Sequence, residues 1–369
     1  MHVVYIFTYP YSLKLWKDSG HLSRELIHFK KLNQLYGIRF TLVTYGDKYD
    51  KKLVNEDFID IVPVYDLTKK TKYNFLNLIK TFTVPFKIKK IIHEPDIIIQ
   101  NQLMGAWVSI IYKSLVKRKY IMRTGYDMME FAKEENKSFW KILLYYYLTL
   151  LAILNAKIYQ VTSEADLDLL KHRFKYLNQD KIKLRRNWSS VHKPQNFEGR
   201  YKDKIISIGR LEKQKNYEFL IKNLKNTGLT LDIYGEGSLK NDLENTAKEQ
   251  NVKVNFLGFK DNEEILREIS NYKYYVTSSL FEGNPKTVLE AMGRGCIVIA
   301  SNIKNHNEII NNNKNGYLYK LDNKSLNKVL VSLGKDTDTE NSIAKNAYET
   351  IKSRNSLEKL CELEYKDFS

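Results

Sequence analysis

The sequence predicts an α/β protein made of two doubly wound domains, each with a parallel sheet. Three observations support this prediction. The chain has 369 residues, which suits two domains of ordinary size. Short apolar runs alternate with helical patterns in both halves, as in βαβ units. Hydrophobic residues make up 43% of the chain, which is enough for two packed cores.

In the first half, apolar runs predict strands and longer periodic segments predict helices. The strands are expected at 2–7, 38–44, 96–100, 120–123 and 158–162, and the helices at 22–36, 102–115 and 139–155. The segment 142–156 is the most apolar, but its roughly 15 residues are fewer than the ~20 that a membrane-spanning helix needs. We therefore predict a buried helix there.

Residues 69–90 combine seven lysines with aromatic and aliphatic side chains. One interpretation is an amphipathic helix that packs on its own sheet and keeps its lysines in water. The other is a peripheral contact with an anionic membrane. The sequence leaves both open.

The second half repeats the alternation after a basic, irregular stretch at 181–199. We predict strands at 204–208, 229–235, 254–258, 272–277 and 296–300, and helices from 217, from Pro285 and at 263–270 and 357–368. The resulting domains are 1–190 and 200–350, followed by a C-terminal segment, 351–369. The Gly-x-Gly at 235–237 lacks the third glycine of a dinucleotide fingerprint, so we reject that function.

A loop and helix after the strand at 272–277 carry the main functional signal. Pro285 suits the first helical position, and the next amides, those of Lys286 and Thr287, are expected to be free to bind an anion. Glu282 on the loop and Glu290 in the helix flank this position. A ligand that is anionic in its middle and rich in hydroxyls at both ends, such as a sugar nucleotide, would fit.

A second cluster follows the strand at 204–208. Gly209 would let a ligand approach the backbone closely. Arg210 and Lys215 then offer a forked guanidinium and a point ammonium, which suit a diphosphate.

Together these segments resemble the retaining glycosyltransferases of family four, which have the GT-B fold. Glu282, Gly283, Pro285, Glu290, Ala291 and Met292 match the carboxylate-pair motif of that family, and Arg210 with Lys215 is similar to its diphosphate clamp. The resemblance is specific over 204–318 and only topological over the first 190 residues. It implies two Rossmann-like domains that face a cleft, and a C-terminal helix that crosses back to the first domain.

The resemblance and the chemistry assign expected roles. Arg210, Lys215 and Glu282 are the predicted catalytic residues: the cations would stabilise the diphosphate leaving group, and Glu282 would lie on the sugar side. Glu290 would bind the ribose hydroxyls. The donor site would also include Gly209, Phe259, Asn284, Pro285, Lys286 and Thr287.

Four residues of the first domain are candidates for contact with the acceptor or the sugar. Gly20 and His21 lie in a loop similar to the family's glycine-containing loop, although the paired glycines are missing. Arg123 and Asp127 stand where many relatives have a His-Asp pair, so no histidine role is transferred. Asp127 has an alternative role as a helix N-cap.

Charge and cysteine content narrow the class of protein. There are 60 Lys and Arg residues against 43 Asp and Glu, a formal charge of +17, which favours anionic partners. Cys296 and Cys361 are too far apart in sequence for a disulfide framework or a metal-ligand spacing, which fits a reducing cytoplasm. The start of the chain lacks the basic region of a signal peptide. We expect a cytoplasmic protein, either free or peripheral on the inner face of the cell membrane.

The sequence thus predicts a retaining hexosyltransferase that needs neither metal nor cofactor. Its donor would be a nucleotide-diphosphate sugar and its acceptor a saccharide or lipid-linked saccharide, in the assembly of bacterial cell-surface polysaccharide or glycolipid. Two alternatives stay open. A sugar-nucleotide epimerase of the same fold would turn over the donor without an acceptor. A basic nucleic-acid-binding protein would need a binding module that is not recognised in the sequence.

Overall fold

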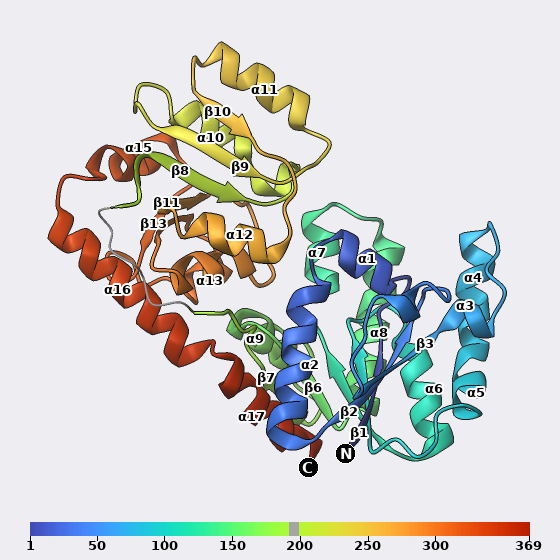
Figure 1. Ribbon diagram of the computed structural model, residues 1–369. Coiled ribbons are helices and arrows are strands. Elements are labelled where there is room, and N and C mark those ends of the chain that lie inside the picture. The colour runs from blue at the N-terminus through green and yellow to red at the C-terminus, as the bar shows by residue number, and fades with distance from the viewer. Residues whose placement is uncertain (192–198) are drawn as a thin grey trace. The chain divides into compact units, whose positions relative to one another are not determined.

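The computed structural model describes residues 1–191 and 199–369 (Figure 1). The chain divides into two compact units, Met1–Arg185 with Cys361–Ser369 and Arg186–Leu360. Part of the predicted linker, residues 192–198, lies outside the described residues. The predicted domain limits stay predictions, and each unit is described below by itself.

The first unit has a seven-stranded sheet in the order β3-β2-β1-β4-β5-β6-β7, and its paired strands are parallel. The strands are β1 (His2–Ile6), β2 (Arg39–Thr44), β3 (Ile59–Pro63), β4 (Ile97–Asn101), β5 (Lys119–Arg123), β6 (Ile158–Val161) and β7 (Ile182–Leu184). The order reverses between β1 and β4, as it does in Rossmann-like folds, where ligands bind beside such a switch point.

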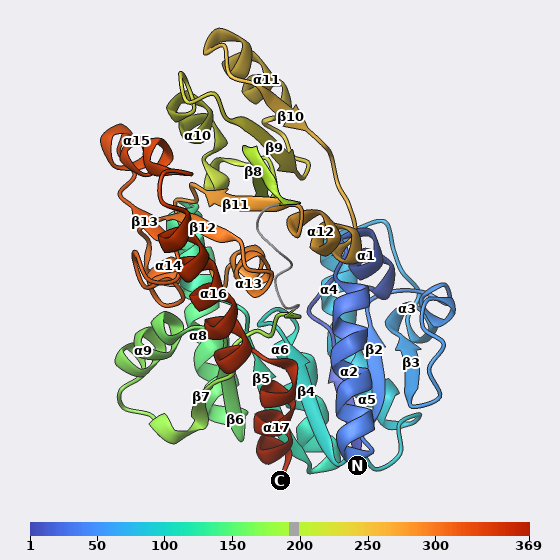
Figure 2. The same cartoon turned by 60° about the vertical axis from the view of Figure 1, so that its left-hand side comes forward.

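Helices cover both faces of this sheet (Figures 1 and 2). They are α1 (Leu13–Asp18), α2 (Leu22–Tyr36), η1 (Asp50–Lys52), α3 (Val64–Leu67), α4 (Asn74–Lys80), η2 (Thr81–Thr83), α5 (Val84–Lys89), α6 (Ala106–Val116), α7 (Met128–Glu134), α8 (Phe139–Asn155), α9 (Glu164–Arg173) and η3 (Gln179–Lys181). The apolar strands are buried on both sides, because an all-parallel sheet carries helices on both faces.

The second unit has a six-stranded sheet in the order β10-β9-β8-β11-β12-β13, and its paired strands are also parallel. The strands are β8 (Tyr201–Ile208), β9 (Thr230–Tyr234), β10 (Val254–Phe256), β11 (Tyr272–Thr277), β12 (Ile297–Ser301) and β13 (Tyr317–Tyr319). The helices are η5 (Lys213–Lys215), α10 (Tyr217–Asn223), α11 (Lys240–Glu249), α12 (Asn262–Ile269), α13 (Lys286–Gly293), α14 (Lys304–Asn307), α15 (Asn323–Ser332) and α16 (Thr337–Arg354). The order reverses between β8 and β11. The predicted pair of Rossmann-like α/β domains is thereby confirmed.

The last helix, α17 (Leu357–Phe368), is held on the first unit by buried charges. Glu364 lies 2.6 Å from Nε2 of His28 and 3.8 Å from the Arg123 guanidinium. Burial alone would raise the pKa of Glu364, but His28 and Arg123 hold it below its ordinary value. Asp367 pairs with Arg185 at 2.5 Å. These contacts anchor the end of the chain to β5, α2 and the residue after β7.

Several predicted elements need correction. Strands β3 and β7 were not predicted, and β7 interrupts the stretch at 181–199 that we expected to be irregular. Helix α1 separates β1 from the loop with Gly20, so that loop does not directly follow the strand. Residues 69–90 form two short helices, α4 and α5, instead of one, and Pro85 lies in the first turn of the second.

The helix predicted at 142–156 is present, but the prediction that it is buried is wrong for most of its residues. Within α8 only Thr149, Ala152 and Ile153 are buried, and six large apolar side chains are exposed. Elsewhere the helix limits agree well, and α2, α8, α17 and strand β11 begin and end at the predicted residues.

Candidate functional site at the switch point of the second sheet

Two loops meet at the carboxyl edge of the second sheet, where the strand order reverses between β8 and β11. One loop follows β8 (209–216) and the other follows β11 (278–285). Gln214 ties them together, because its carbonyl accepts from the Leu280 amide at 2.9 Å and its side chain donates to the Phe281 carbonyl at 2.8 Å. The Ser278 hydroxyl donates to the carbonyls of Lys215 and Asn216. The two loops are therefore joined at the place where such sheets bind ligands.

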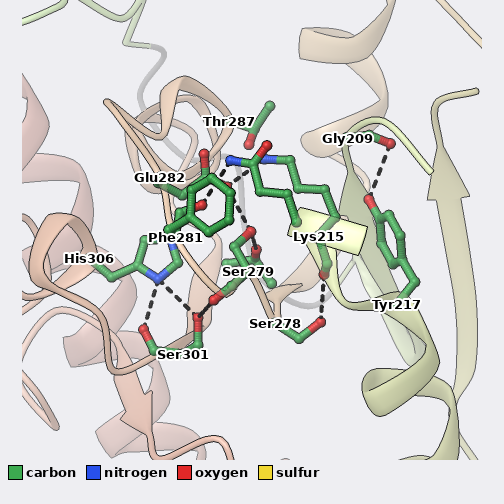
Figure 3. A network of polar contacts seen from close by, with 12 residues as sticks. Gly209, Lys215, Tyr217, Ser278, Ser279, Phe281, Glu282, Thr287, Ser301 and His306 are labelled. Carbon is green, nitrogen blue, oxygen red and sulfur yellow. Dashed lines mark hydrogen bonds and ion pairs between the residues drawn. The ribbon is translucent and has the colours of Figure 1, made fainter. Parts of the chain in front are cut away.

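The two loops bring Lys215 and Glu282 into direct contact (Figure 3). The Lys215 ammonium lies 2.5 Å from a Glu282 carboxylate oxygen, and the side chains are 18% and 10% exposed. The Ser279 hydroxyl donates to the same oxygen at 2.7 Å. A charge pair in such a sheltered place is stronger than one on the open surface. Glu282 thus holds the ammonium group in position at the edge of the sheet.

Three glycines make room for this arrangement. A Cβ on Gly209 would lie 2.9 Å from Cε of Lys215, so a larger residue would displace the lysine. A Cβ on Gly235 would lie 2.1 Å from the Gly209 carbonyl oxygen, and one on Gly237 would lie 2.5 Å from that of Leu211. Gly235 and Gly237 therefore let the loop after β9 pack against the loop after β8, which explains the Gly-x-Gly sequence without a dinucleotide.

A buried histidine lies near this pair, and sequence analysis did not identify it. His306 is fully buried, and its Nδ1 lies 2.8 Å from the Ser301 carbonyl oxygen. The Ser301 hydroxyl donates to the Ser279 carbonyl at 2.6 Å, which links the histidine to the loop of Glu282. Burial lowers the pKa of His306. His306 lies five residues after the end of β12, and no short motif in the sequence marks its position.

The pKa of His306 is lower in the folded protein than the 6.5 of a free side chain. The buried neutral imidazole therefore makes its full contribution to the free energy of unfolding only above pH 6.5. Below pH 6.5 the unfolded chain binds a proton that the folded protein resists. We therefore expect the melting temperature to fall from pH 7 to pH 5.5 more steeply in the wild type than in a His306→Asn variant. Equal slopes in a differential scanning fluorimetry series would contradict this.

The start of α13 differs from the prediction. Pro285 is the N-cap, not the first helical residue, a shift of one position. The Lys286 amide donates to the Asn284 carbonyl at 2.9 Å, so the prediction that this amide is free is wrong. Among the described residues, the Thr287 amide has no hydrogen-bond acceptor, and the Thr287 hydroxyl pairs with that of Tyr275 at 2.8 Å. A single backbone donor therefore remains at this helix end.

The other donor-site candidates lie on neighbouring elements of the same unit. Glu290 is buried in α13 and accepts a hydrogen bond from the Asn262 amide group at 3.0 Å. Phe259 is half exposed and follows Gly258, whose carbonyl accepts from the Gly235 amide at 2.8 Å. Arg210 is exposed and has no ion-pair partner among the described residues. Its guanidinium is thus available to an anionic ligand.

The candidates of the first unit have mainly structural contacts. Asp127 caps α7 by accepting from the Glu130 amide at 2.8 Å and pairs with Arg173 at 2.9 Å. Arg123 lies between Glu25 and Glu364, at 3.9 and 3.8 Å, and 11% of its side chain is exposed. Gly20 has a φ of 71°, and His21 is exposed just before α2. Their predicted contact with acceptor or sugar stays a prediction, and for Arg123 and Asp127 the geometry favours a structural role.

Two further kinds of feature, a metal site and a membrane span, bear on the function. Within 1–191 and 199–369, no three His, Cys, Asp or Glu side chains are grouped so that they could hold a metal ion. No helix of these residues is long and apolar enough to cross a bilayer.

Comparison with known proteins gives a family match for the second half of the chain. Residues 190–350 match the family described as glycosyl transferases group 1. The chain is 36% identical to the N-acetylgalactosamine-N,N'-diacetylbacillosaminyl-diphospho-undecaprenol 4-alpha-N-acetylgalactosaminyltransferase of Campylobacter jejuni. This alignment of 131 residues covers 34% of this chain and 35% of that enzyme. It is 31% identical to an uncharacterized glycosyltransferase of Methanocaldococcus jannaschii over 67% of this chain and 66% of that protein. The chain thus aligns with between a third and two thirds of these relatives' lengths.

A solved structure extends the similarity to the whole fold. The Anabaena protein HepE, in complex with UDP and glucose, has a TM-score of 0.75 at 16% identity, covering 100% of this chain and 99% of that one. At this identity the match shows the fold alone. Residues 190–350 therefore belong to the glycosyl transferases group 1, and the two Rossmann-like units give the chain the GT-B fold.

Proposed function

We propose that this protein is a glycosyltransferase that takes a sugar from a nucleotide-diphosphate sugar. The observation that carries the proposal is the Lys215–Glu282 pair, 2.5 Å apart at the switch point of the second sheet. A cation beside a carboxylate can meet both parts of the donor, because the ammonium attracts the diphosphate and the carboxylate accepts hydrogen bonds from sugar hydroxyls.

Arg210 would act with Lys215 on the leaving diphosphate. As the glycosidic bond breaks, negative charge grows on the phosphate oxygens, and fixed cations stabilise that charge more than they stabilise the bound donor. The Thr287 amide would add one backbone donor. Because Glu282 already holds Lys215, the ammonium needs little reorganisation when the donor arrives.

The acceptor is proposed to be a saccharide or a lipid-linked saccharide. The Campylobacter jejuni relative is named for a diphospho-undecaprenol acceptor, and HepE was crystallised with UDP and glucose. These names support a role in cell-surface polysaccharide or glycolipid assembly, and a nucleotide such as UDP in the donor. Retention of the anomeric configuration and independence from metal ions are part of the proposal.

One assay tests the proposal against its alternatives. Purified protein is incubated with nucleotide sugars in EDTA, with and without saccharide acceptors, and both nucleotide release and product configuration are measured. Acceptor-dependent release of the nucleoside diphosphate, with an α-linked product from an α-linked donor, supports it. Donor conversion without acceptor would indicate an epimerase, although the relatives named above give no support to that function. A thermal-shift screen with UDP, GDP, ADP and CMP would select the donor base.

Glu290 is proposed to accept hydrogen bonds from the ribose hydroxyls. Its carboxylate is buried and bound by Asn262, so Glu290→Gln keeps the size of the side chain and removes the charge-assisted acceptor. We expect the donor KM to rise by roughly 10- to 100-fold with a smaller change in kcat, since such a contact is worth about 1.5–3 kcal/mol. Steady-state kinetics with varied donor would check this, and an unchanged donor KM would exclude the ribose role.

A membrane-linked acceptor would favour a peripheral position on the inner face of the cell membrane. We propose that residues 69–90 contact anionic lipid there. Their lysines include Lys69, Lys70, Lys72 and Lys80, and Phe75 is 70% exposed on α4. Lysines next to exposed aromatic side chains suit the headgroup region of a bilayer.

A further inference from the structure

Four helices of the first unit, α4, α5, α6 and α8, form one layer. Helix α6 packs against both α5 and α8, and right-handed crossovers place α6 and α8 on the same face of the sheet (Figure 1). The opposite face is covered by α2 and α17. The rings of Tyr36 in α2 and Tyr365 in α17 stack with their centroids 4.0 Å apart. The layer therefore has one side on the sheet and one side directed away from it.

Large apolar side chains are exposed on this layer in unusual density. Half of the exposed large hydrophobic residues of the described chain belong to α4, α5, α8 and their adjoining turns. We call these residues the apolar face, and they are Tyr73, Phe75, Leu76, Ile79, Phe82, Phe86, Ile91, Phe139, Trp140, Leu144, Tyr147, Leu151 and Leu154. Single exposed hydrophobics are ordinary, but a concentration of them indicates an interaction site.

Helix α8 supplies the most continuous part of the apolar face. Over its 17 residues its only charge is Lys141, and Trp140, Leu144, Tyr147, Leu151 and Leu154 follow one another at helical spacing. Trp140 is 75% exposed and Phe139 is 67% exposed. At about 1.5 Å per residue, α8 is shorter than a membrane-spanning helix. It has the length and composition of a helix that lies in the plane of a bilayer surface.

The charges of the layer have one sign. No aspartate or glutamate occurs in residues 67–93, 97–126 or 136–163, which contain all four helices, whereas these stretches hold seven, three and three lysines. A hollow of about 480 Å³ at the end of α8 is lined by Lys113, Lys119, Lys157 and Lys181, with one acid, Asp180. The pKa of Lys157 is lowered by burial and by the neighbouring Lys119. The apolar face is thus bordered by positive charge.

We propose that the layer docks on an anionic bilayer surface, with α8 lying in the interface beside residues 69–90. The lysines would face acidic headgroups, while the aromatic and aliphatic side chains enter the headgroup boundary, a depth that Trp and Tyr prefer. The charge pattern decides between occupants. A second copy of the chain would bring lysines against lysines, whereas an anionic lipid surface complements them. The proposal does not depend on sugar transfer and adds α8 to the contact described above.

Vesicle sedimentation of the full chain tests this docking. The probes are vesicles of phosphatidylcholine alone and of phosphatidylcholine with phosphatidylglycerol. The test variant is Leu144→Ser with Leu151→Ser, and the matched control is Leu321→Ser with Val331→Ser, two exposed aliphatic residues of the second unit. All four sites are exposed, so melting temperatures should stay within about 2 °C of wild type.

We expect the wild type and the control to bind the anionic vesicles, and the α8 variant to bind about 30-fold more weakly, as lost burial of two leucines implies. Salt should weaken wild-type binding. Wild-type failure to bind anionic vesicles, or equal binding by the α8 variant, would overturn the proposal. A wild-type dimer in light scattering that the α8 variant converts to a monomer, without any vesicle binding, would assign the face to a second copy instead.

Discussion

Replacing Lys215 by alanine is expected to lower kcat by about 100-fold or more, the usual effect of losing one group that stabilises developing negative charge. Lys215 is the cation placed most firmly at the switch point, since Glu282 holds its ammonium at 2.5 Å and Gly209 leaves space for its side chain. Rapid-quench or steady-state measurement of nucleotide release, once a donor is known, provides the rate.

The matched control for this variant is Lys213→Ala. Lys213 is an exposed lysine of the same turn, η5, and should keep near-normal activity. Lys215→Ala also leaves the sheltered Glu282 carboxylate without its cation, which costs on the order of 1–3 kcal/mol of stability. The melting temperature must therefore be measured beside kcat, and Lys215→Arg, which restores the charge, should recover part of the rate. A folded Lys215→Ala enzyme with normal kcat would rule out the proposed role.

Much of the fold follows from the order of short-range patterns. The helical periodicity of α2 ends at a glycine, and the aromatic and β-branched run of β11 has turn residues after it, so local signals define both limits. Strand β7 has only three residues and no such pattern, because its place is fixed by pairing with β6. The exposure of α8 could not be predicted, since a helix that is apolar all round normally indicates burial.

The candidate site shows the same division between local and long-range information. The motifs around Arg210 and Glu282 pointed to two loops from local signals alone, because each loop follows a strand and contains turn residues. The contact of Lys215 with Glu282 joins positions 67 residues apart and depends on the strand order. The engaged Lys286 amide and the nearby His306 were missed for the same reason. They are set by tertiary packing that no short motif encodes.

Arg210→Ala is expected to lower kcat by about 100-fold as well, but for a reason that differs from the case of Lys215. Arg210 is exposed and makes no ion pair in the described residues, so the variant should keep the wild-type melting temperature. Any loss of rate would then come from a lost contact with the bound donor and not from a loss of folded protein. Arg210→Lys retains the charge but loses the fork that binds two phosphate oxygens, and an intermediate rate is expected.

The double variant Arg210→Ala with Lys215→Ala decides whether the two cations share one target. If both bind the same diphosphate, removing the second cation after the first should cost less than its separate effect, because the remaining group can no longer hold the phosphate in the productive geometry. The combined loss should then fall clearly short of the ~10,000-fold that independent effects would multiply to. Fully multiplicative losses would mean that Arg210 and Lys215 act on different groups, and the diphosphate clamp would have to be abandoned even if each single variant were slow.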